Sequence, residues 1–533
     1  MALMRSTLTV SSMTLASRIL GFVRDLVFAR AFGAGPAMDA FFVAFRIPNF
    51  MRRLFAEGSF SLAFVPVLAE YREKQDRAAL KQLIDSVTGT LAAVLLLVTG
   101  VGILLAPWVI RIFAPGFETG GEQHALASSM LRLTFPYLFF ISLTALAGGI
   151  LNSFNRFALP ALTPVLLNIA LIAAALGLAP RMAQPEMALA WGVLAAGILQ
   201  LLVQIPALMK LGLLPRPRWG AAHAGVRRIL KLMLPTLFGS SVAQVNLLFD
   251  TLVASLLMSG SVTWLYYSDR LMEFPLGMFG VAIGTVILPH LSRKHSADDA
   301  DGFSDGLDWA LRTCLLVAVP ASLGLILAGG PIYAAMFQYG EFGATDSKMA
   351  ALSLAGLSLG LPAFLLVKVL APAFYSRQDT RTPVKAAVVS LLANAFFTVL
   401  LLGLVLSLTD IGAESMANSD GWLDAMAKVP GAHACLALAS GLAGWLNAAQ
   451  LWRHLKREGR YRARPGWLAY LLRLLLAGAA MAALLIWANG QWPDWSPWTA
   501  WERVARLFAL VAAAALVFAG ALFGSGFRRR QLG

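Results

Sequence analysis

Hydrophobic residues run through the chain in long stretches, each bounded by charged residues, proline or glycine. A helix needs about 20 apolar residues to cross a bilayer core, whereas a strand of a membrane β-barrel would be an alternating segment of about ten. The pattern therefore predicts an all-α polytopic membrane protein with fourteen spans. These lie at roughly 8–34, 38–68, 86–113, 124–151, 157–178, 187–212, 229–258, 262–289, 308–336, 349–374, 384–408, 431–452, 466–488 and 498–524.

Composition and charge agree with this topology. Hydrophobic residues make up 58% of the chain and charged residues 13%, against about 25% charged in soluble domains. One set of alternating connections holds 25 Lys and Arg and the other holds four, so the rich set and both termini are expected in the cytoplasm. The net charge of +15 then reflects topology, and we expect no nucleic-acid partner. The rich set is 70–83, 152–158, 208–231, 290–296, 376–385, 452–464 and 527–533.

The chain contains an internal repeat. In the second span of each half an Arg lies about twenty residues before a Pro, and an Asn follows a Pro in the fifth span of each half. The matched positions are Arg46 and Pro66 with Arg270 and Pro289, and Asn168 with Asn394. This predicts two parallel six-helix bundles, at 1–220 and 221–460, and an appended helix pair with a basic tail at 461–533. Such repeats suit alternating access around a central cavity.

Several spans contain charged residues, which cost at least ~2.5–3.5 kcal/mol in a bilayer unless they face protein or water. In the first span Ser17 and Arg24 share one helical stripe and Arg18 and Asp25 share the next. A second polar face follows in the second span, and a third polar group precedes Pro275. The candidate substrate-binding residues are Ser17, Arg18, Arg24, Asp39, Asn49, Arg52, Arg53, Glu57, Asp269, Arg270 and Glu273.

Arginines outnumber carboxylates among the charges within these spans. One interpretation is that the charges neutralise each other between helices, for example Arg24 with Asp39 or Arg18 with Glu57. The other is that surplus guanidinium groups bind an anionic cargo, because the planar fork of Arg binds phosphate bidentately. A cation exporter would instead be expected to keep bare carboxylates. The whole set favours a phosphorylated cargo.

A separate polar group suggests an ion site. Asp250 lies in the seventh span, and Asn394 and Thr398 lie one turn apart in the eleventh. These oxygens would suit Na⁺, or Asp250 would carry a proton; a single hydrogen-bonded Asp is an equally good explanation. The six His are scattered, so we assign no firm metal site and no cofactor.

Recognisable nucleotide-binding, zinc-protease and dithiol motifs are missing from the sequence. We therefore expect no enzyme activity, and transport energy from an ion gradient, the membrane potential or withdrawal of product.

Three long motifs carry a family resemblance. They are SRILGFVRD at 17–25, AMDAFFVAFRIPN at 37–49 with RRLFAEG at 52–58, and YYSDRLMEFP at 266–275. Together they closely resemble the MurJ (MviN) lipid II flippases of the MOP exporter superfamily, over the length of the chain. The resemblance implies that undecaprenyl-pyrophosphate-linked peptidoglycan precursor moves from the inner to the outer leaflet of the bacterial cytoplasmic membrane.

The resemblance also implies roles for individual residues. Arg18, Arg24, Arg52 and Arg270 match the cavity arginines of the family, and the appended helix pair matches its lipid-accommodating groove. Some members pair an Asn with an Asp where Thr398 stands here, so Na⁺, H⁺ and membrane potential stay open. Expected partners are lipid II, membrane lipids and cell-wall synthesis proteins. The alternatives are export of another polyprenyl-linked glycan, cation-coupled drug export, and a scaffolding role in cell-wall synthesis.

Overall fold

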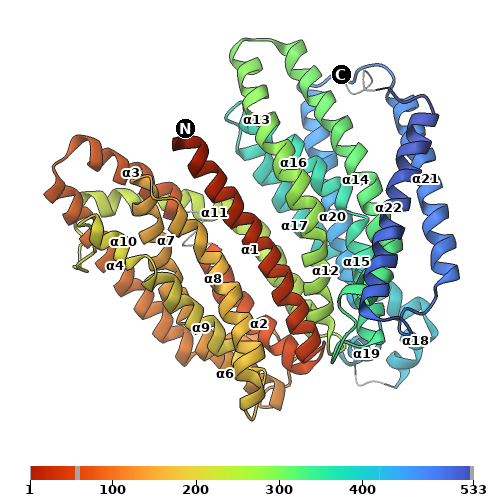
Figure 1. Cartoon of the computed structure of the whole chain (residues 1–533), viewed down its shortest axis with the longest axis horizontal. Helices are drawn as coiled ribbons and strands as arrows, with labels where there is room; N and C mark the ends of the chain where they lie inside the picture. Colours follow the sequence, from red (N-terminus) through yellow and green to blue (C-terminus); the bar gives the residue numbers. More distant parts are fainter. Residues whose placement is uncertain (1, 54–59, 419–420, 529–533) are drawn as a thin grey trace. The chain divides into compact units, whose positions relative to one another are not determined.

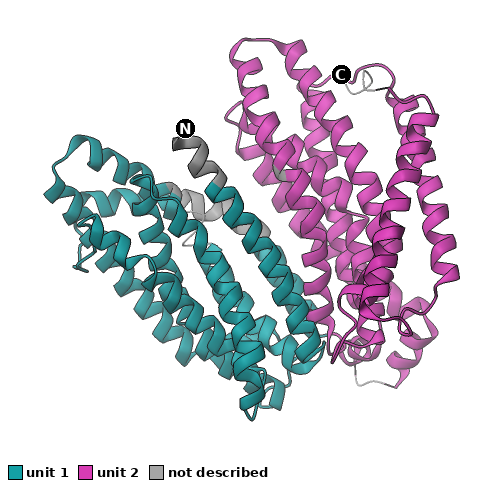
Figure 2. Ribbon diagram, in the orientation of Figure 1, with its two compact units in different colours: residues 1–256 teal, residues 257–533 magenta. Residues whose placement is uncertain are grey.

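A computed structural model describes residues 2–53, 60–418 and 421–528, and no strand occurs among them. This confirms the predicted all-α class. The helices group into two compact units, Met1–Leu256 and Leu257–Gly533, which Figure 2 shows in different colours. The helix labels used below are those of Figure 1.

Eleven helical segments in the described part of the chain are long and apolar enough to cross a membrane. Each overlaps one of the predicted stretches, with boundaries that differ by up to nine residues. The three remaining stretches, 8–34, 38–68 and 229–258, are those that hold Arg24, Asp39 and Asp250. Most of their described residues are also helical, in α1, α2, α3 and α11. The protein is therefore a multi-pass helical membrane protein, and the total of fourteen crossings stays a prediction.

In the first unit, α1 lies along α8, α2 lies along α6, and α3 packs on α7 and α11. A large apolar core fills the space between α3, α4, α7 and α11 and includes the fully buried Phe64, Ile84 and Ile150. The helices are α1 (Ala2–Phe32), α2 (Pro36–Arg52), α3 (Ser61–Lys74), α4 (Arg77–Leu104), α5 (Ala106–Phe113), α6 (Glu122–Thr134), α7 (Tyr137–Ser153), α8 (Ala158–Ala173), α9 (Met187–Leu202), α10 (Ile205–Lys210) and α11 (Ala224–Ser255).

In the second unit, α14 contacts α15, α16, α21 and α22, while α17 pairs with α20. The two C-terminal helices α21 and α22 form a hairpin against α14, and Tyr470, Leu474 and Ala477 are buried in this contact. The helices are α12 (Ser261–Pro275), α13 (Val281–Ser296), α14 (Ala300–Met336), α15 (Ala344–Ser358), α16 (Leu361–Tyr375), α17 (Arg381–Leu408), α18 (Asp410–Ala417), α19 (Trp422–Lys428), α20 (His433–Arg457), α21 (Trp467–Gln491) and α22 (Ala500–Gly524).

Proline residues divide several of the predicted spans into two helices. The span at 124–151 is divided at Pro136, because a proline removes a backbone donor and its ring clashes with the preceding turn. The span at 262–289 has a π-helical turn at Leu276–Gly280, directly after Pro275. Such turns widen the helix locally and are frequent at functional sites.

The compact units and the sequence repeat divide the chain at different points. The repeat places the boundary near residue 220, whereas packing assigns α11 to the first unit. The reason is that α11 packs on α3, α5, α2 and α4. In addition, the guanidinium of Arg46 on α2 donates a hydrogen bond to the Thr251 hydroxyl on α11.

Candidate functional site

The first predicted polar stripe centres on Arg24 of α1, whose side chain is buried in the first unit. Arg24 Nε and Nη2 both donate to Asp25 Oδ1, at 3.0 and 2.6 Å. Its Nη1 donates to Asn168 Oδ1 on α8 at 3.1 Å, and the guanidinium lies 5.6 Å from the centre of the Phe28 ring. The Asn168 amide also donates to the Ser17 backbone carbonyl at 3.0 Å. The structure therefore brings together two predicted residues, Ser17 and Arg24, through Asn168.

Arg18 lies on a different side of the same helix. Its side chain is exposed and forms no ion pair with the described residues, while Ser17 is half-buried. Burial thus separates two arginines that the sequence placed only six residues apart: Arg24 is held inside the unit, and Arg18 is accessible.

The exposure of the side chains on the polar face of α2 increases from its first residues to its last. Asp39 and Arg46 are buried, Asn49 and Arg52 are half-buried, and Arg53 is exposed. Asn49 Oδ1 accepts hydrogen bonds from Arg52 Nε and Nη2 at 2.9 and 2.8 Å, so these two predicted residues are in contact.

Glu57 also belongs to the predicted set, and it lies outside the described residues.

The corresponding group in the second unit lies near the end of α12. Arg270 Nη1 contacts Glu273 Oε2 at 2.8 Å, with 29% of the Arg270 side chain and 57% of the Glu273 side chain exposed. Asp269 is half-buried beside them. This pair is accessible, and it immediately precedes the π-helical turn after Pro275.

The three residues of the predicted ion site lie in different units. Asp250 of α11 belongs to the first unit, where its Oδ2 accepts from Asn246 Nδ2 at 3.2 Å. Asn394 and Thr398 of α17 are buried in the second unit, where Asn394 Oδ1 accepts from the Ser440 hydroxyl at 3.2 Å. Among the described residues the Thr398 hydroxyl has no hydrogen-bond partner. Joint coordination of an ion by all three stays a prediction, and the described residues contain no cluster of His, Cys, Asp or Glu suited to a metal.

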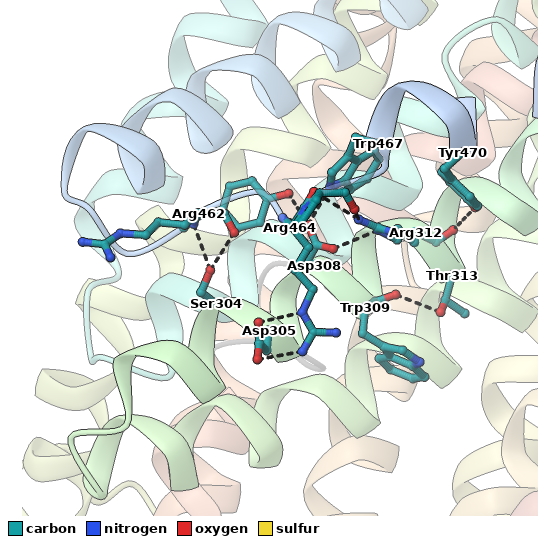
Figure 3. A network of polar contacts seen from close by, with 12 residues as sticks. Ser304, Asp305, Asp308, Trp309, Arg312, Thr313, Arg462, Arg464, Trp467 and Tyr470 are labelled. Carbon is teal, nitrogen blue, oxygen red and sulfur yellow. Dashed lines mark hydrogen bonds and ion pairs between the residues drawn. The ribbon is translucent and has the colours of Figure 1, made fainter. Parts of the chain in front are cut away.

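A polar cluster that the sequence did not predict joins α14 to the segment before α21 (Figure 3). Asp308 is fully buried and forms an ion pair with Arg312 at 2.8 Å. Asp308 Oδ1 also accepts from the Tyr461 hydroxyl at 2.8 Å and from Trp467 Nε1 at 2.6 Å. Burial, and then the neighbouring Asp308 carboxylate, raise the pKa of Tyr461 well above its usual range. We call Asp308, Arg312, Tyr461 and Trp467 the Asp308 cluster.

The backbone of the same segment is also bound to α14. Arg312 Nη2 donates to the carbonyl of Pro465 at 3.2 Å, and the Tyr470 hydroxyl donates to the carbonyl of Arg312 at 2.6 Å. Arg464 contacts Asp305 through two nitrogens, at 2.7 and 2.6 Å, and this hydrogen bonding raises the pKa of Arg464. These contacts hold the beginning of the appended helix pair, residues 461–470, against α14. One feature of the sequence could have indicated this cluster: Asp308 and Arg312 lie four residues apart, one helical turn, at the start of an apolar helix.

These arrangements indicate what the predicted residues can do chemically. Arg18 and Arg270 present guanidinium groups that a ligand can reach, whereas Arg24 is buried and paired with Asp25. Guanidinium groups bind carboxylates and phosphates in preference to cations. The described site residues are thus suited to binding an anion.

Comparisons with known proteins identify the family. The model of the family described as lipid II flippase MurJ matches residues 28–505. A probable lipid II flippase MurJ of Vibrio cholerae is 42% identical, over 99% of this chain and 97% of the relative. The lipid II flippase MurJ of Burkholderia cenocepacia is 41% identical, over 99% and 98% respectively.

Solved structures agree with this assignment. A structure of lipid II flippase MurJ in an inward closed conformation superposes with a TM-score of 0.76 at 26% identity, over 97% of this chain and 99% of that one. An inward-facing multidrug resistance MATE transporter of the MOP superfamily gives a TM-score of 0.61 at 14% identity, over 84% of this chain and 99% of that one, and so shares the fold alone. The resemblance expected from the sequence motifs is confirmed: this chain belongs to the lipid II flippase MurJ family.

Proposed function

We propose that this protein is a lipid II flippase. It moves the undecaprenyl-pyrophosphate-linked peptidoglycan precursor from the inner to the outer leaflet of the bacterial cytoplasmic membrane, by alternating access and with both termini in the cytoplasm. The observation that carries the proposal is the identity of 41–42% to relatives named lipid II flippase MurJ, over nearly the whole chain. The arginines of both compact units support it, because they suit the charge of this cargo.

The accessible arginines bind the pyrophosphate of the cargo. An unpaired diphosphate is too costly to move through hydrocarbon, so guanidinium groups must replace its hydration. Arg270 is suited to this because its partner Glu273 is more than half exposed, and such ion pairs contribute only about 0–1 kcal/mol. A diphosphate can therefore displace Glu273 from Arg270 at little cost.

The polyprenyl tail of the cargo stays in contact with apolar surface during transport. The C-terminal helices α21 and α22 expose large hydrophobic side chains, including Leu475, Phe508 and Leu516, which are 66%, 76% and 73% exposed. In a bilayer this surface meets acyl chains. The Asp308 cluster holds α21 against α14, so this apolar surface is fixed in place and can contact the tail.

Energy for transport comes from an ion gradient, the membrane potential or withdrawal of the product. Asp250, Asn394 and Thr398 are the residues that would respond to a coupling ion. Exchange of Na⁺ for another cation in a transport assay separates sodium coupling from the other two sources.

A leaflet-accessibility assay for lipid II in cells depleted of this protein tests the proposal. Lipid II should accumulate in the inner leaflet, and the wild-type gene should restore its appearance outside. The Arg270→Ala variant should fail to do so although it reaches the membrane, whereas the Arg453→Ala variant, altered at an exposed residue of α20, should restore it. Accumulation of a different polyprenyl-linked glycan, or drug sensitivity with normal lipid II export, would overturn the proposal.

A further inference from the structure

The linker between α10 and α11, at residues 213–223, is bound along the beginning of α4 and exposes basic side chains. We propose that Arg216, Arg218 and Trp219 of this linker form a binding surface for the headgroups of anionic phospholipids. The proposed topology puts this surface at the cytoplasmic leaflet, and in that respect the proposal rests on the proposed function.

The linker is attached to α4 through its backbone. The N–H of Arg216 donates to Asp85 Oδ1 at 2.7 Å, and the N–H of Arg218 donates to the Asp85 carbonyl at 3.1 Å. A Cβ atom at Gly89 would overlap the backbone of Arg218, so glycine is needed there for the linker to approach so closely. The linker therefore follows a defined path along α4, although residues 213–220 form no helix.

These backbone contacts leave the side chains of the linker accessible. Arg216 and Arg218 are exposed and form no ion pair with the described residues, and 70% of Trp219 is exposed. The sequence from 187 to 249 contains no Asp or Glu that could neutralise them locally. Guanidinium groups bind phosphate bidentately, and the amphipathic ring of Trp favours the headgroup level of a bilayer. The linker is thus complementary to a membrane surface that carries negatively charged phosphates.

The position of the linker along α4 favours a lipid over a soluble anion as its ligand. Asp85, which binds the linker, is the last charged residue of α4, and the apolar stretch predicted at 86–113 follows it directly. The linker therefore lies where α4 enters the bilayer, which is the level of the lipid headgroups. Anionic lipids of the cytoplasmic leaflet attract basic segments next to a span.

The second unit contains a matching attachment in which the side chains have other partners. Asp85 and Asp308 are each the ninth residue of their helix, and Asp308 Oδ1 accepts from the N–H of Arg464 at 3.3 Å. There the Arg464 side chain contacts Asp305, and Trp467 Nε1 donates to Asp308. The linker at 213–223 is attached without such side-chain contacts, so its Arg and Trp side chains are available to a ligand.

Trypsin digestion of the full-length protein in lipid nanodiscs tests the proposal. Trypsin cuts after Arg218 but not after Arg216, because Pro217 follows Arg216. Cleavage after Arg218 should be about 25-fold slower in discs that contain phosphatidylglycerol than in discs of phosphatidylcholine alone, at about fivefold for each arginine held at an anionic surface. Arg216→Gln should reduce this protection to about fivefold, whereas the control Arg453→Gln, altered at an exposed residue of α20, should keep it. A soluble peptide digested in the same mixture corrects for changes in trypsin activity.

Equal cleavage in the two kinds of disc, or undiminished protection in Arg216→Gln, would overturn the proposal. Protection of the phosphatidylcholine discs by inorganic phosphate would also overturn it, because the ligand would then be a soluble anion. The discs contain no lipid II, so the result does not depend on transport of the cargo. Failure of the proposed function would appear in the leaflet-accessibility assay instead, and the two failures are distinguishable.

Discussion

The Asp308 cluster makes a prediction about how the C-terminal helix pair is held. Replacing Asp308 by Ala leaves Arg312 buried without its carboxylate, and only 6% of the Arg312 side chain is exposed. Removing one partner of a buried ion pair costs about 3–5 kcal/mol, because the other charge stays desolvated. The Tyr461 hydroxyl and Trp467 Nε1 lose their acceptor as well. The segment between α20 and α21 should then detach from α14.

Limited digestion with trypsin measures this detachment directly. The bond after Arg462 is protected, because the Arg462 N–H donates to the Ser304 hydroxyl at 2.8 Å and the Arg462 carbonyl accepts from it at 3.0 Å. Cleavage follows the population of the open form when opening is fast, and a loss of 3 kcal/mol raises that population by about 100-fold. Asp308→Ala should therefore be cut there about 100 times faster than the wild type.

Asp305→Asn is the matched control for this experiment. Asp305 lies on the same helix and contacts Arg464 of the same segment, but 47% of its side chain is exposed. An exposed pair contributes about 0–1 kcal/mol, so cleavage should accelerate by about fivefold at most. Equal cleavage rates for the two variants would refute the assignment of the Asp308 cluster as the attachment.

Two further predictions concern stability, and thermal denaturation of purified variants measures both. Arg503→Leu should lower the melting temperature clearly, because the buried Arg503 guanidinium donates to four backbone carbonyls, those of Ala334 and Gln338 at the end of α14 and those of Ser496 and Trp498 before α22. Arg506→Leu, which loses mainly a contact with the Trp498 ring, is the control and should change it little. Gly360→Ala should also destabilise, since its Cβ would lie 2.4 Å from Gly441 Cα, whereas Gly403→Ala meets nothing within 4 Å and should be neutral or stabilising. A reversed order within either pair would contradict the packing described here.

The sequence predicted the fold class because its signal is local. A stretch of apolar residues determines a membrane helix without reference to the rest of the chain, so the stretches at 86–113 and 384–408 correspond to α4 with α5 and to α17. The motifs around Arg24 and Arg270 identified the family for a similar reason, since each is contiguous. The division of the units at Leu256 was not predictable, because it depends on how α11 packs.

The sequence-based prediction of the site missed contacts between residues that lie far apart in the chain. The structure shows Asp25 and Asn168 in contact with Arg24, and the sequence had named neither as its partner. Asn168 follows Arg24 by 144 residues, and only the helix packing of α1 on α8 brings the two together. The Asp308 cluster was missed for the same reason, as Tyr461 lies 153 residues after Asp308. In each case the chemistry was visible in the sequence and the proximity was not.

Transport of lipid II by the purified protein in vesicles tests the central claim most directly. Labelled lipid II is placed in one leaflet, and its appearance in the other is followed for the wild type, Arg270→Ala and Arg453→Ala. The account predicts transport by the wild type and Arg453→Ala and none above protein-free vesicles by Arg270→Ala. Undiminished transport by Arg270→Ala would show that transport does not need the Arg270 guanidinium, and would contradict the account.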